Sequence, residues 1–217
     1  MANSQYLEQA WLNQWRGTLY TIPGTTYLGL STTPITTGPG GTTGITEPSG
    51  NNYARVAVTS TTGNWGAAGG GFPASIANAS SFNFPTPSGS GWGTIVNWFF
   101  SDAATGGNIL DFGPLALAQS DPFSGNGTQT VFTSSAAPVG DPTYDAVAVT
   151  VGGVAKAIFT DYGLTWNAAG TVTVTFNTAP ISGSNNVVLD YQKAVSQAVP
   201  ANAAVAFGAG QLTVSLY

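Results

Sequence analysis

Carboxylates are the side chains of this chain that could do chemistry, because the sequence contains no histidine and no cysteine. The lack of histidine excludes Ser-His-Asp and Cys-His catalysis and imidazole metal ligands, and the lack of cysteine excludes disulfides and thiolate metal sites. A pair of acids across a cleft, as in glycoside hydrolysis, is the enzymatic option that remains. The acids are scattered, mostly beside Gly or Pro, and the candidates before residue 120 are Glu47, Asp102 and Asp111. We expect these acids to cap turns or pair with arginine, and we predict no catalytic residues and no enzymatic activity.

Two other polar patterns each have a chemical and a structural interpretation. Arg55 lies in a predicted strand, and because a lone buried guanidinium is costly, we expect it to pair with an acid such as Glu47 or Asp102. Oxygen ligands for calcium are available further along, at Asp121, Asn126, Asp141 and Asp145. Loops rich in Asp and Asn are common in β modules that bind no metal, so we predict neither a metal nor another cofactor.

Three aromatic residues are candidates for binding sugar at the surface. They lie in or beside predicted turns and are Tyr144, Tyr162 and Trp166. Aromatic platforms on the loops of a β-sandwich suit carbohydrate rings, and a host-surface glycan is the ligand that this arrangement would take. The alternative is that Trp166 and Tyr191 fill the small core of their own segment.

The composition favours contact with other protein subunits. Charged residues make up 6% of the chain, while 42% is hydrophobic and 12% is aromatic, which argues against disorder. Nine acids against four scattered bases cannot neutralise a run of phosphates, so we predict no nucleic-acid partner. No apolar run is long enough to span a bilayer, and there is no basic segment typical of secretion, so we predict no membrane partner and synthesis in a cytoplasm. A surface of small neutral polar groups is suited to subunit contacts, since few charges must be desolvated there.

One helix is predicted, over residues 3–16. Asn3 or Ser4 can cap its start, and Gly17 ends it. Apolar side chains recur every four residues and form one stripe, at Leu7, Trp11 and Trp15. The stripe either packs on the sheet of its own chain or docks into a neighbouring subunit, and the residues alone leave both alternatives open.

From Thr18 onward the pattern changes to strands. Residues 54–58 alternate between apolar and small or polar side chains, while residues 95–100 are almost all apolar and predict a strand covered on both faces. Further strands are predicted near residues 26–33, 81–84, 115–119 and 211–217. Short strands separated by turn residues indicate an all-β chain whose main body is an antiparallel sandwich or jelly roll.

Residues 120–195 behave as a separate module. They begin with a turn-rich stretch, Asp-Pro-Phe-Ser-Gly-Asn-Gly, and contain a Val-Gly-Gly-Val hairpin between two alternating runs. About six strands fit within this segment, enough for a second small β-sandwich nested in the first. We therefore predict an N-terminal helix in residues 1–17, a body made of residues 18–119 plus 196–217, and an outward-projecting insert at 120–195.

Several stretches of the predicted body resemble a known family. They are Tyr27-Leu-Gly-Leu-Ser-Thr-Thr33, the run from Glu47 through Tyr53-Ala-Arg-Val56, Trp92-Gly-Thr-Ile-Val96, Asp102-Ala-Ala-Thr-Gly-Gly-Asn108 and Val205-Ala-Phe-Gly-Ala-Gly-Gln-Leu-Thr-Val214. This ordered set resembles small tailed-phage virion structural proteins, usually labelled tail fibre proteins, across residues 1–119 and 196–217. The insert resembles a different phage tail-repeat β module and is a departure from the usual short family members. The resemblance implies a structural role in the virion and brings no catalytic residues.

Composition and resemblance together predict a non-enzymatic phage structural protein that is assembled in the host cytoplasm and located in the virion. Because the chain lacks the heptads, collagen triplets or long β repeats of an elongated fibre, we favour an oligomeric capsid decoration (cement) protein that stabilises the head. The predicted partners are further copies of the chain, most simply in a trimer, and other virion proteins such as the major capsid protein. The alternative is a tail fibre or tail-tip subunit that binds a glycan of the host surface.

Overall fold

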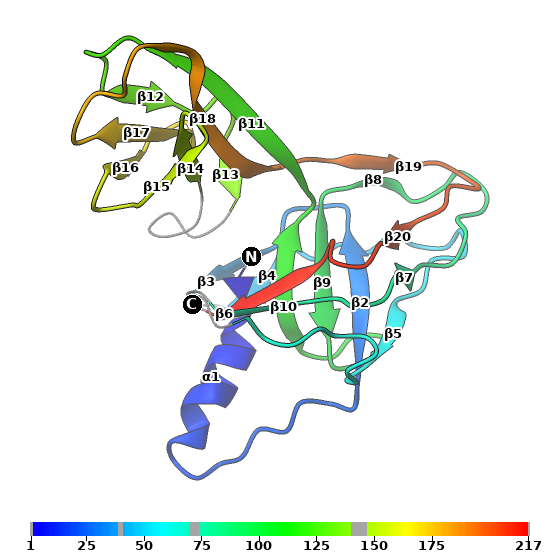
Figure 1. Ribbon diagram of the computed structural model, residues 1–217. Helices are drawn as coiled ribbons and strands as arrows, with labels where there is room; N and C mark the ends of the chain where they lie inside the picture. Colours follow the sequence, from blue (N-terminus) through cyan, green and yellow to red (C-terminus); the bar gives the residue numbers. More distant parts are fainter. Residues whose placement is uncertain (1, 39–40, 70–73, 140–146, 217) are drawn as a thin grey trace. The chain divides into compact units, whose positions relative to one another are not determined.

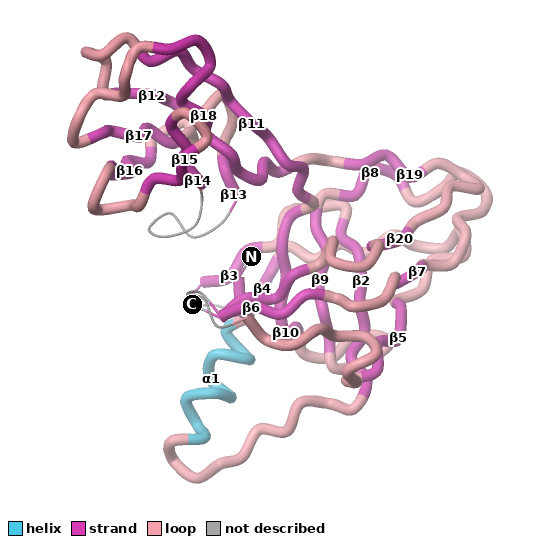
Figure 2. The backbone as a smooth tube through the Cα atoms, in the orientation of Figure 1, coloured by secondary structure: helices cyan, strands magenta, loops and turns pink. Residues whose placement is uncertain are grey.

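The structure is a computed structural model that describes residues 2–38, 41–69, 74–139 and 147–216. Within these ranges it contains one helix and is otherwise built from strands and loops (Figures 1 and 2). Every strand pairing in these ranges is antiparallel, apart from a single isolated parallel bridge between Ile158 and Tyr162. The predicted all-β, antiparallel fold class is therefore confirmed.

The chain divides into two compact units, the first made of residues 1–115 and 196–217 and the second of residues 116–195. The predicted boundary at residue 120 falls inside a strand, β11 (Ala116–Gly125), which pairs along its length with β18 (Gly183–Ala194). The turn-forming residues that follow residue 119 predict that a strand ends there. The strand instead continues through these turn-forming residues, because they pair with β18.

The elements of the first unit are one helix and a series of short strands. They are β1 (Ala2–Asn3), α1 (Gln5–Gln14), β2 (Thr25–Ser31), β3 (Thr36–Gly38), β4 (Gly41–Thr43), β5 (Val56–Thr59), β6 (Ala74–Ala77), β7 (Phe82–Asn83), β8 (Gly93–Ile95), β9 (Asn97–Ser101), β10 (Ile109–Pro114), β19 (Gln197–Val199), β20 (Ala206–Phe207) and β21 (Thr213–Leu216). Five of them form the main sheet, in the order β1-β10-β9-β2-β5.

The main sheet has apolar side chains on both faces. Strand β9 is buried at every position, as its apolar sequence predicts for a strand covered on both sides. Phe100 packs on one face with the larger core cluster, which includes Leu28 and Trp92, while Phe99 packs on the other face with Phe112. Successive side chains of a strand point to opposite faces, which is why neighbouring phenylalanines serve two different clusters.

The C-terminal residues complete the first unit. Strands β19, β20 and β21 pair in turn with β8, β7 and β6, so residues 197–216 run antiparallel along residues 74–95. Leu212, in this returning segment, is 1% exposed and belongs to the larger core cluster. The described strands form one five-stranded sheet and several two-stranded ribbons, and not the paired four-stranded sheets of a jelly roll. The jelly-roll part of the prediction is therefore not confirmed.

The second unit contains two sheets around one core. Its other elements are β12 (Val131–Thr133), β13 (Pro138–Val139), β14 (Ala148–Val151), β15 (Val154–Lys156), β16 (Tyr162–Trp166) and β17 (Val172–Phe176). One sheet has the order β11-β18-β14-β15, with β13 also paired to β18, and the other has the order β12-β17-β16. Val149 and Leu189 of the first sheet and Val174 of the second belong to the same buried cluster, which is the arrangement of a small sandwich.

Helix α1 begins where β1 ends. Ser4 caps it by accepting a hydrogen bond from the Leu7 amide at 3.1 Å, and the Ser4 amide donates to the Leu110 carbonyl of β10 at 3.1 Å. The helix contacts β10 and β4 and then extends away from the strands of its unit, as Figure 1 shows. In the described part of the chain, no helix has the length and apolar character needed to cross a membrane.

Candidate functional site

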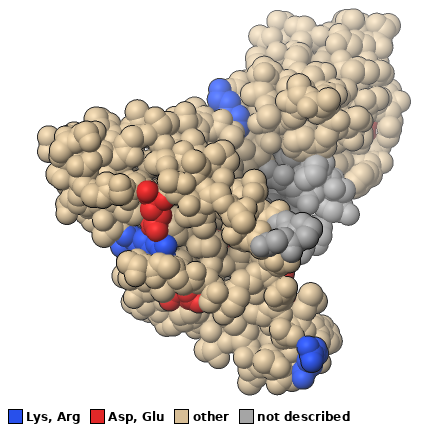
Figure 3. Space-filling view, turned by 180° about the vertical axis from the view of Figure 1, so that it is seen from behind, with Lys and Arg blue, Asp and Glu red and all other residues tan. Residues whose placement is uncertain are grey.

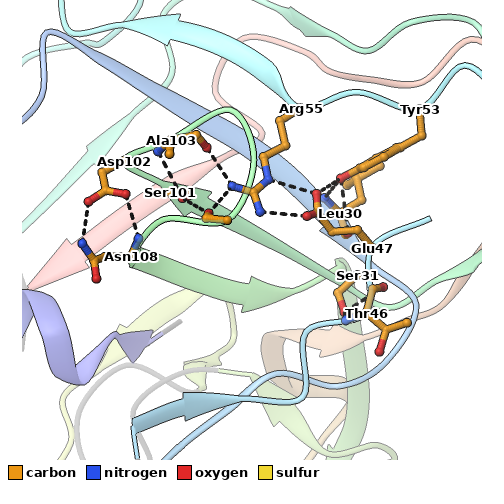
Figure 4. Close-up of polar contacts among 11 residues, drawn as sticks. Leu30, Ser31, Thr46, Glu47, Tyr53, Arg55, Ser101, Asp102, Ala103 and Asn108 are labelled. Carbon is orange, nitrogen blue, oxygen red and sulfur yellow. Dashed lines mark hydrogen bonds and ion pairs between the residues drawn. The ribbon is translucent and has the colours of Figure 1, made fainter. Parts of the chain in front are cut away.

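Arg55 lies just before β5 and forms a bidentate ion pair with Glu47 (Figure 4). Its Nε donates to Glu47 Oε1 at 3.0 Å and its Nη2 donates to Oε2 at 2.7 Å. The Tyr53 hydroxyl donates to the same Oε1 at 2.8 Å. The expected pairing of Arg55 with an acid is confirmed, and Glu47 is the partner.

The other donors of Arg55 fix the loop between β9 and β10. Nη1 donates to the carbonyls of Ala103 and Gly106, at 2.7 and 2.8 Å, and the guanidinium lies 4.9 Å from the centre of the Phe99 ring. Asp102, in the same loop, accepts two hydrogen bonds from Asn108, both at 2.7 Å. Glu47 and Asp102 therefore have the structural roles expected of them, in an ion pair and in a turn.

Asp111 has a different environment from the other two acids. It is 3% exposed, and its Oδ1 accepts a hydrogen bond from the Phe112 amide at 2.9 Å, while its Oδ2 has no partner. Its cross-strand neighbour Asn3 also has a buried side-chain oxygen without a partner, so two acceptors on adjacent strands lack a donor. Burial raises the pKa of Asp111 to about 7, although the hydrogen bond from Phe112 acts in the opposite direction.

A β-bulge explains why Asp111 faces the larger core cluster. The pairing between β10 and β9 shifts register between Ile109 and Asp111, so Leu110 is the extra residue and Asp111 is opposite Phe100. Paired residues share a face, which places Asp111 on the side of Phe100. A pocket of about 420 Å³ lies there, lined by Asp111, Leu110 and Phe100 of the sheet and by Leu7, Tyr20 and Ile22 of the N-terminal segment, among others.

The predicted apolar stripe of α1 is buried at the start of the helix and exposed at its end. Leu7, in the first half, is 9% exposed, whereas Trp11 is 43% and Trp15 is 93% exposed. Leu12, also exposed at 69%, lies beside Trp15 on the helix surface. We call Trp11, Leu12 and Trp15 the α1 patch. The body of the same chain thus covers the start of the stripe and leaves its end uncovered.

The three predicted sugar-binding aromatics are not shown together at the surface. Tyr162 is 4% exposed and belongs to the core of the second unit, and Trp166 is half-buried against the same core. Tyr144 lies outside the described residues. The side chain of Tyr162 points from β16 into the core of the sandwich, so its ring cannot stack on a sugar. Tyr191 fills the same core, as the alternative interpretation proposed.

The calcium ligands considered from the sequence are used differently where they are described. Asp121 accepts hydrogen bonds from the Ser135 amide and hydroxyl at 2.6 and 2.7 Å, from the Tyr191 hydroxyl at 2.7 Å, and from Gln119. Burial alone would raise the pKa of Asp121, but these hydrogen bonds outweigh it and hold the pKa below its ordinary value. Asn126 caps a turn through the amides of Thr128 and Gln129, while Asp141 and Asp145 lie outside the described residues. Among the residues that the structure describes, no three acids are grouped as a metal site would require.

The pocket beside Asp111 is the feature that sequence analysis missed. One signal was present, because Asp111 interrupts the apolar run Ile109-Leu-Asp-Phe, and an acid inside a buried strand is costly without a partner. The bulge that directs Asp111 toward the pocket cannot be read from that run.

Charged side chains are sparse on the face of the molecule shown in Figure 3. The chain has four bases and nine acids in all, and Arg55 and Glu47 neutralise each other. Most of the exposed surface therefore offers small polar and apolar groups to whatever it contacts.

These features define a class: an all-β protein of two units, with an uncovered tryptophan-bearing helix and no grouped metal-ligating side chains in its described residues. Within that class, the chain belongs to the family described as Podophage GP4 fiber I protein gp80, whose model matches residues 2–133. The match covers 132 of the 217 residues, from 2 to 133 inclusive. The resemblance to fibre-type phage virion proteins is thereby confirmed. No curated protein matches the chain.

The matched region passes through the boundary between the two units. It includes residues 2–115 of the first unit and continues through β11 and β12 of the second. The family therefore includes the place where the second unit begins.

Proposed function

We propose that this chain is a non-enzymatic subunit of a phage fibre that assembles with its neighbours through the α1 patch. The observation that carries the proposal is the exposure of two tryptophans at the end of a helix, in a chain of a fibre family. Tryptophan is enriched at the energetic centres of protein interfaces, since a single indole buries a large apolar area at a small cost in conformational entropy.

The surface around the patch supports the same role. Leu19 and Ile22, in the segment that follows α1, are 84% and 52% exposed. Large apolar side chains exposed close to one another along a chain are typical of an interaction surface. Few charges would have to lose their water when such a surface is covered.

The tail-fibre alternative is better supported than the capsid decoration role favoured from the sequence. The decoration role was inferred from the lack of heptads and long repeats. That inference excludes only a long shaft built by the chain itself, and a chain of a fibre family that lacks such repeats can still be a globular fibre subunit.

The location of the protein on the particle tests this proposal. A short peptide tag inserted between Gly152 and Gly153, in the turn between β14 and β15, would be exposed in the second unit. Immunogold labelling of tagged virions should decorate the tail region, and phage lacking the protein should fail to adsorb while their heads keep normal heat resistance. Label distributed evenly over the head, with heat-sensitive capsids in the deletion phage, would contradict the fibre role and support decoration.

A further inference from the structure

Two buried oxygens on neighbouring strands lack a hydrogen-bond partner near the start of the chain. They are Asn3 Oδ1 on β1 and Asp111 Oδ2 on β10, and less than 1 Å² of each atom is accessible to solvent. A water molecule therefore cannot bridge them, and a ligand in the adjoining pocket cannot reach them. Because an unpaired buried acceptor costs free energy, a hydrogen that satisfies these oxygens has to come from the two side chains themselves.

The strand register brings these two side chains together. Asn3 and Asp111 are directly opposite each other in the antiparallel pairing of β1 with β10. The Ser4 amide donates to the Leu110 carbonyl at 3.1 Å, which marks those neighbouring residues as a hydrogen-bonded pair. Such pairs alternate with non-hydrogen-bonded pairs along an antiparallel ladder, so Asn3 and Asp111 form a pair of the second kind. Their Cβ atoms are then about 4.5–5.5 Å apart on one face of the sheet, which is within reach of a side-chain hydrogen bond.

One hydrogen on Asp111 satisfies both oxygens. Its other carboxyl oxygen, Oδ1, accepts from the Phe112 amide at 2.9 Å, so a proton on Oδ2 can point at Asn3 Oδ1. Burial raises the pKa of Asp111 to about 7, which favours the protonated form below that pH. The alternative is an ionised Asp111 that accepts from the Asn3 amide nitrogen, which would bury a negative charge beside a largely apolar pocket.

The surroundings of Asp111 offer little to stabilise a carboxylate. Strands β1 and β9, on either side of β10, contain no acid or base, and Tyr20 is the other titratable residue among the described residues that line the pocket. Burial raises the pKa of Tyr20 as well, so its hydroxyl stays neutral. On α1, Tyr6 packs edge-on against Tyr20 and Glu8 is exposed. The positive charge at the amino end of the chain lowers the pKa of Asp111, but burial outweighs it.

We propose that Asp111 keeps its proton and donates it from Oδ2 to Asn3 Oδ1, so that this one proton holds β1 on β10. Strand β1 leads directly into Ser4, which caps α1 and whose hydroxyl donates to the Ile109 carbonyl. The bond therefore controls how firmly the start of α1 is attached to the main sheet. When Asp111 loses its proton, a carboxylate faces the Asn3 oxygen with no hydrogen between them, and the attachment weakens.

Hydrogen exchange at the Ser4 amide measures this attachment, because that amide is bonded to β10. Its protection, followed by NMR and corrected for the intrinsic exchange rate, should fall as the pH rises from about 4 and level off above about 7 in the wild-type chain. Asp111→Asn, whose amide can donate to Asn3 at every pH, should keep constant protection. Asp190→Asn, which neutralises an exposed acid of the second unit, is the matched control and should behave as the wild type does.

Asn3→Ala reports the direction of the hydrogen bond. An acceptor at Asn3 stabilises neutral Asp111, so removing it should lower the pKa of Asp111 by about one unit. NMR of the Asp111 carboxyl carbon would follow this titration in both proteins. A rise of that pKa in Asn3→Ala would show that Asn3 donates to an ionised Asp111, and would overturn the proposal.

Infrared spectroscopy of the wild-type chain gives a test that does not depend on the folding of any variant. At about pH 6, where exposed acids are ionised, the C=O stretching band of a protonated carboxyl group should be present, and it should disappear as the pH rises through about 7. Absence of the band, or Ser4 protection that does not change with pH, would overturn the role of the proton. Neither result bears on the proposed function, because assembly through the α1 patch is tested by substituting its tryptophans.

Discussion

Arg55 and Asp111 are buried ionisable side chains of one unit, and the chain stabilises only one of them. Arg55 has a bidentate carboxylate, two carbonyls and an aromatic ring around it. Asp111 has one backbone amide and an unpartnered oxygen. A satisfied buried charge is typical of a structural role, whereas a buried acid with an unsatisfied oxygen is typical of a group that keeps its proton.

Removing the partner of Arg55 should destabilise the first unit. Glu47→Ala leaves the guanidinium, whose side chain is 5% exposed, without its counter-ion, and we expect a loss of about 2 kcal/mol after allowance for the partial exposure of Glu47. Urea unfolding followed by tryptophan fluorescence would measure it. Glu8→Ala, on the exposed face of α1, should change the stability by less than about 0.5 kcal/mol. An equally small effect of Glu47→Ala would contradict the structural role of the pair.

Asp111 should make stability depend on pH with the sign opposite to that of an ordinary acid. Its folded pKa of about 7 is above the ordinary value of 3.8, so the neutral form is favoured in the folded protein. The resulting stabilisation is complete below about pH 4 and is lost as the pH rises through about 7, by at most about 4 kcal/mol. Unfolding at pH 4 to 8 should therefore show wild type losing stability relative to Asp111→Asn. A constant difference between the two proteins would rule out the raised pKa.

At the scale of elements, helix α1 shows what a sequence pattern can and cannot predict. The cap at Ser4 and the apolar stripe were predictable, because capping residues and four-residue spacing are local signals. Whether the stripe is covered depends on which strands lie beside the helix. The helix contacts β10 and β4, and Leu7 is its buried residue, whereas Trp15 at its end is exposed.

Substitution by alanine at the two ends of the apolar stripe should affect stability and assembly differently. Leu7→Ala removes a buried side chain and should destabilise the first unit by about 2 kcal/mol. Trp15→Ala should leave stability unchanged within about 0.5 kcal/mol and weaken assembly. Thermal unfolding and sedimentation of the same samples would separate the two effects. Loss of the fold in Trp15→Ala would show that the indole belongs to the core instead.

At the scale of the whole molecule, the alternating apolar patterns were sufficient to predict an all-β chain with a second β module. They could not predict the pairing of residues 197–216 with strands of the body, because such pairing joins residues more than a hundred positions apart. For the same reason the jelly roll was not predictable from strand spacing: the hydrophobic period sets the faces of a strand but not its neighbours.

The second unit should be removable. Its first residue, Ala116, pairs across β11 and β18 with Ala194, the residue before its last, so the chain enters and leaves the unit at adjacent positions. Deleting residues 116–195 and joining Leu115 to Ser196 through two glycines should give a body that folds. Far-ultraviolet circular dichroism and a cooperative thermal transition would establish this, and an aggregated product would contradict the division into two units.

We propose that α1 joins this chain to its neighbours in a phage fibre, a claim that can be checked by measuring incorporation of the chain into virions. Phage lacking the gene would be grown in cells that supply either the wild-type chain or the Trp11→Ala, Trp15→Ala double variant, and purified particles would be assayed for the protein. We predict that the variant is folded in the lysate and absent from the particles. Incorporation at the wild-type level would contradict the claim.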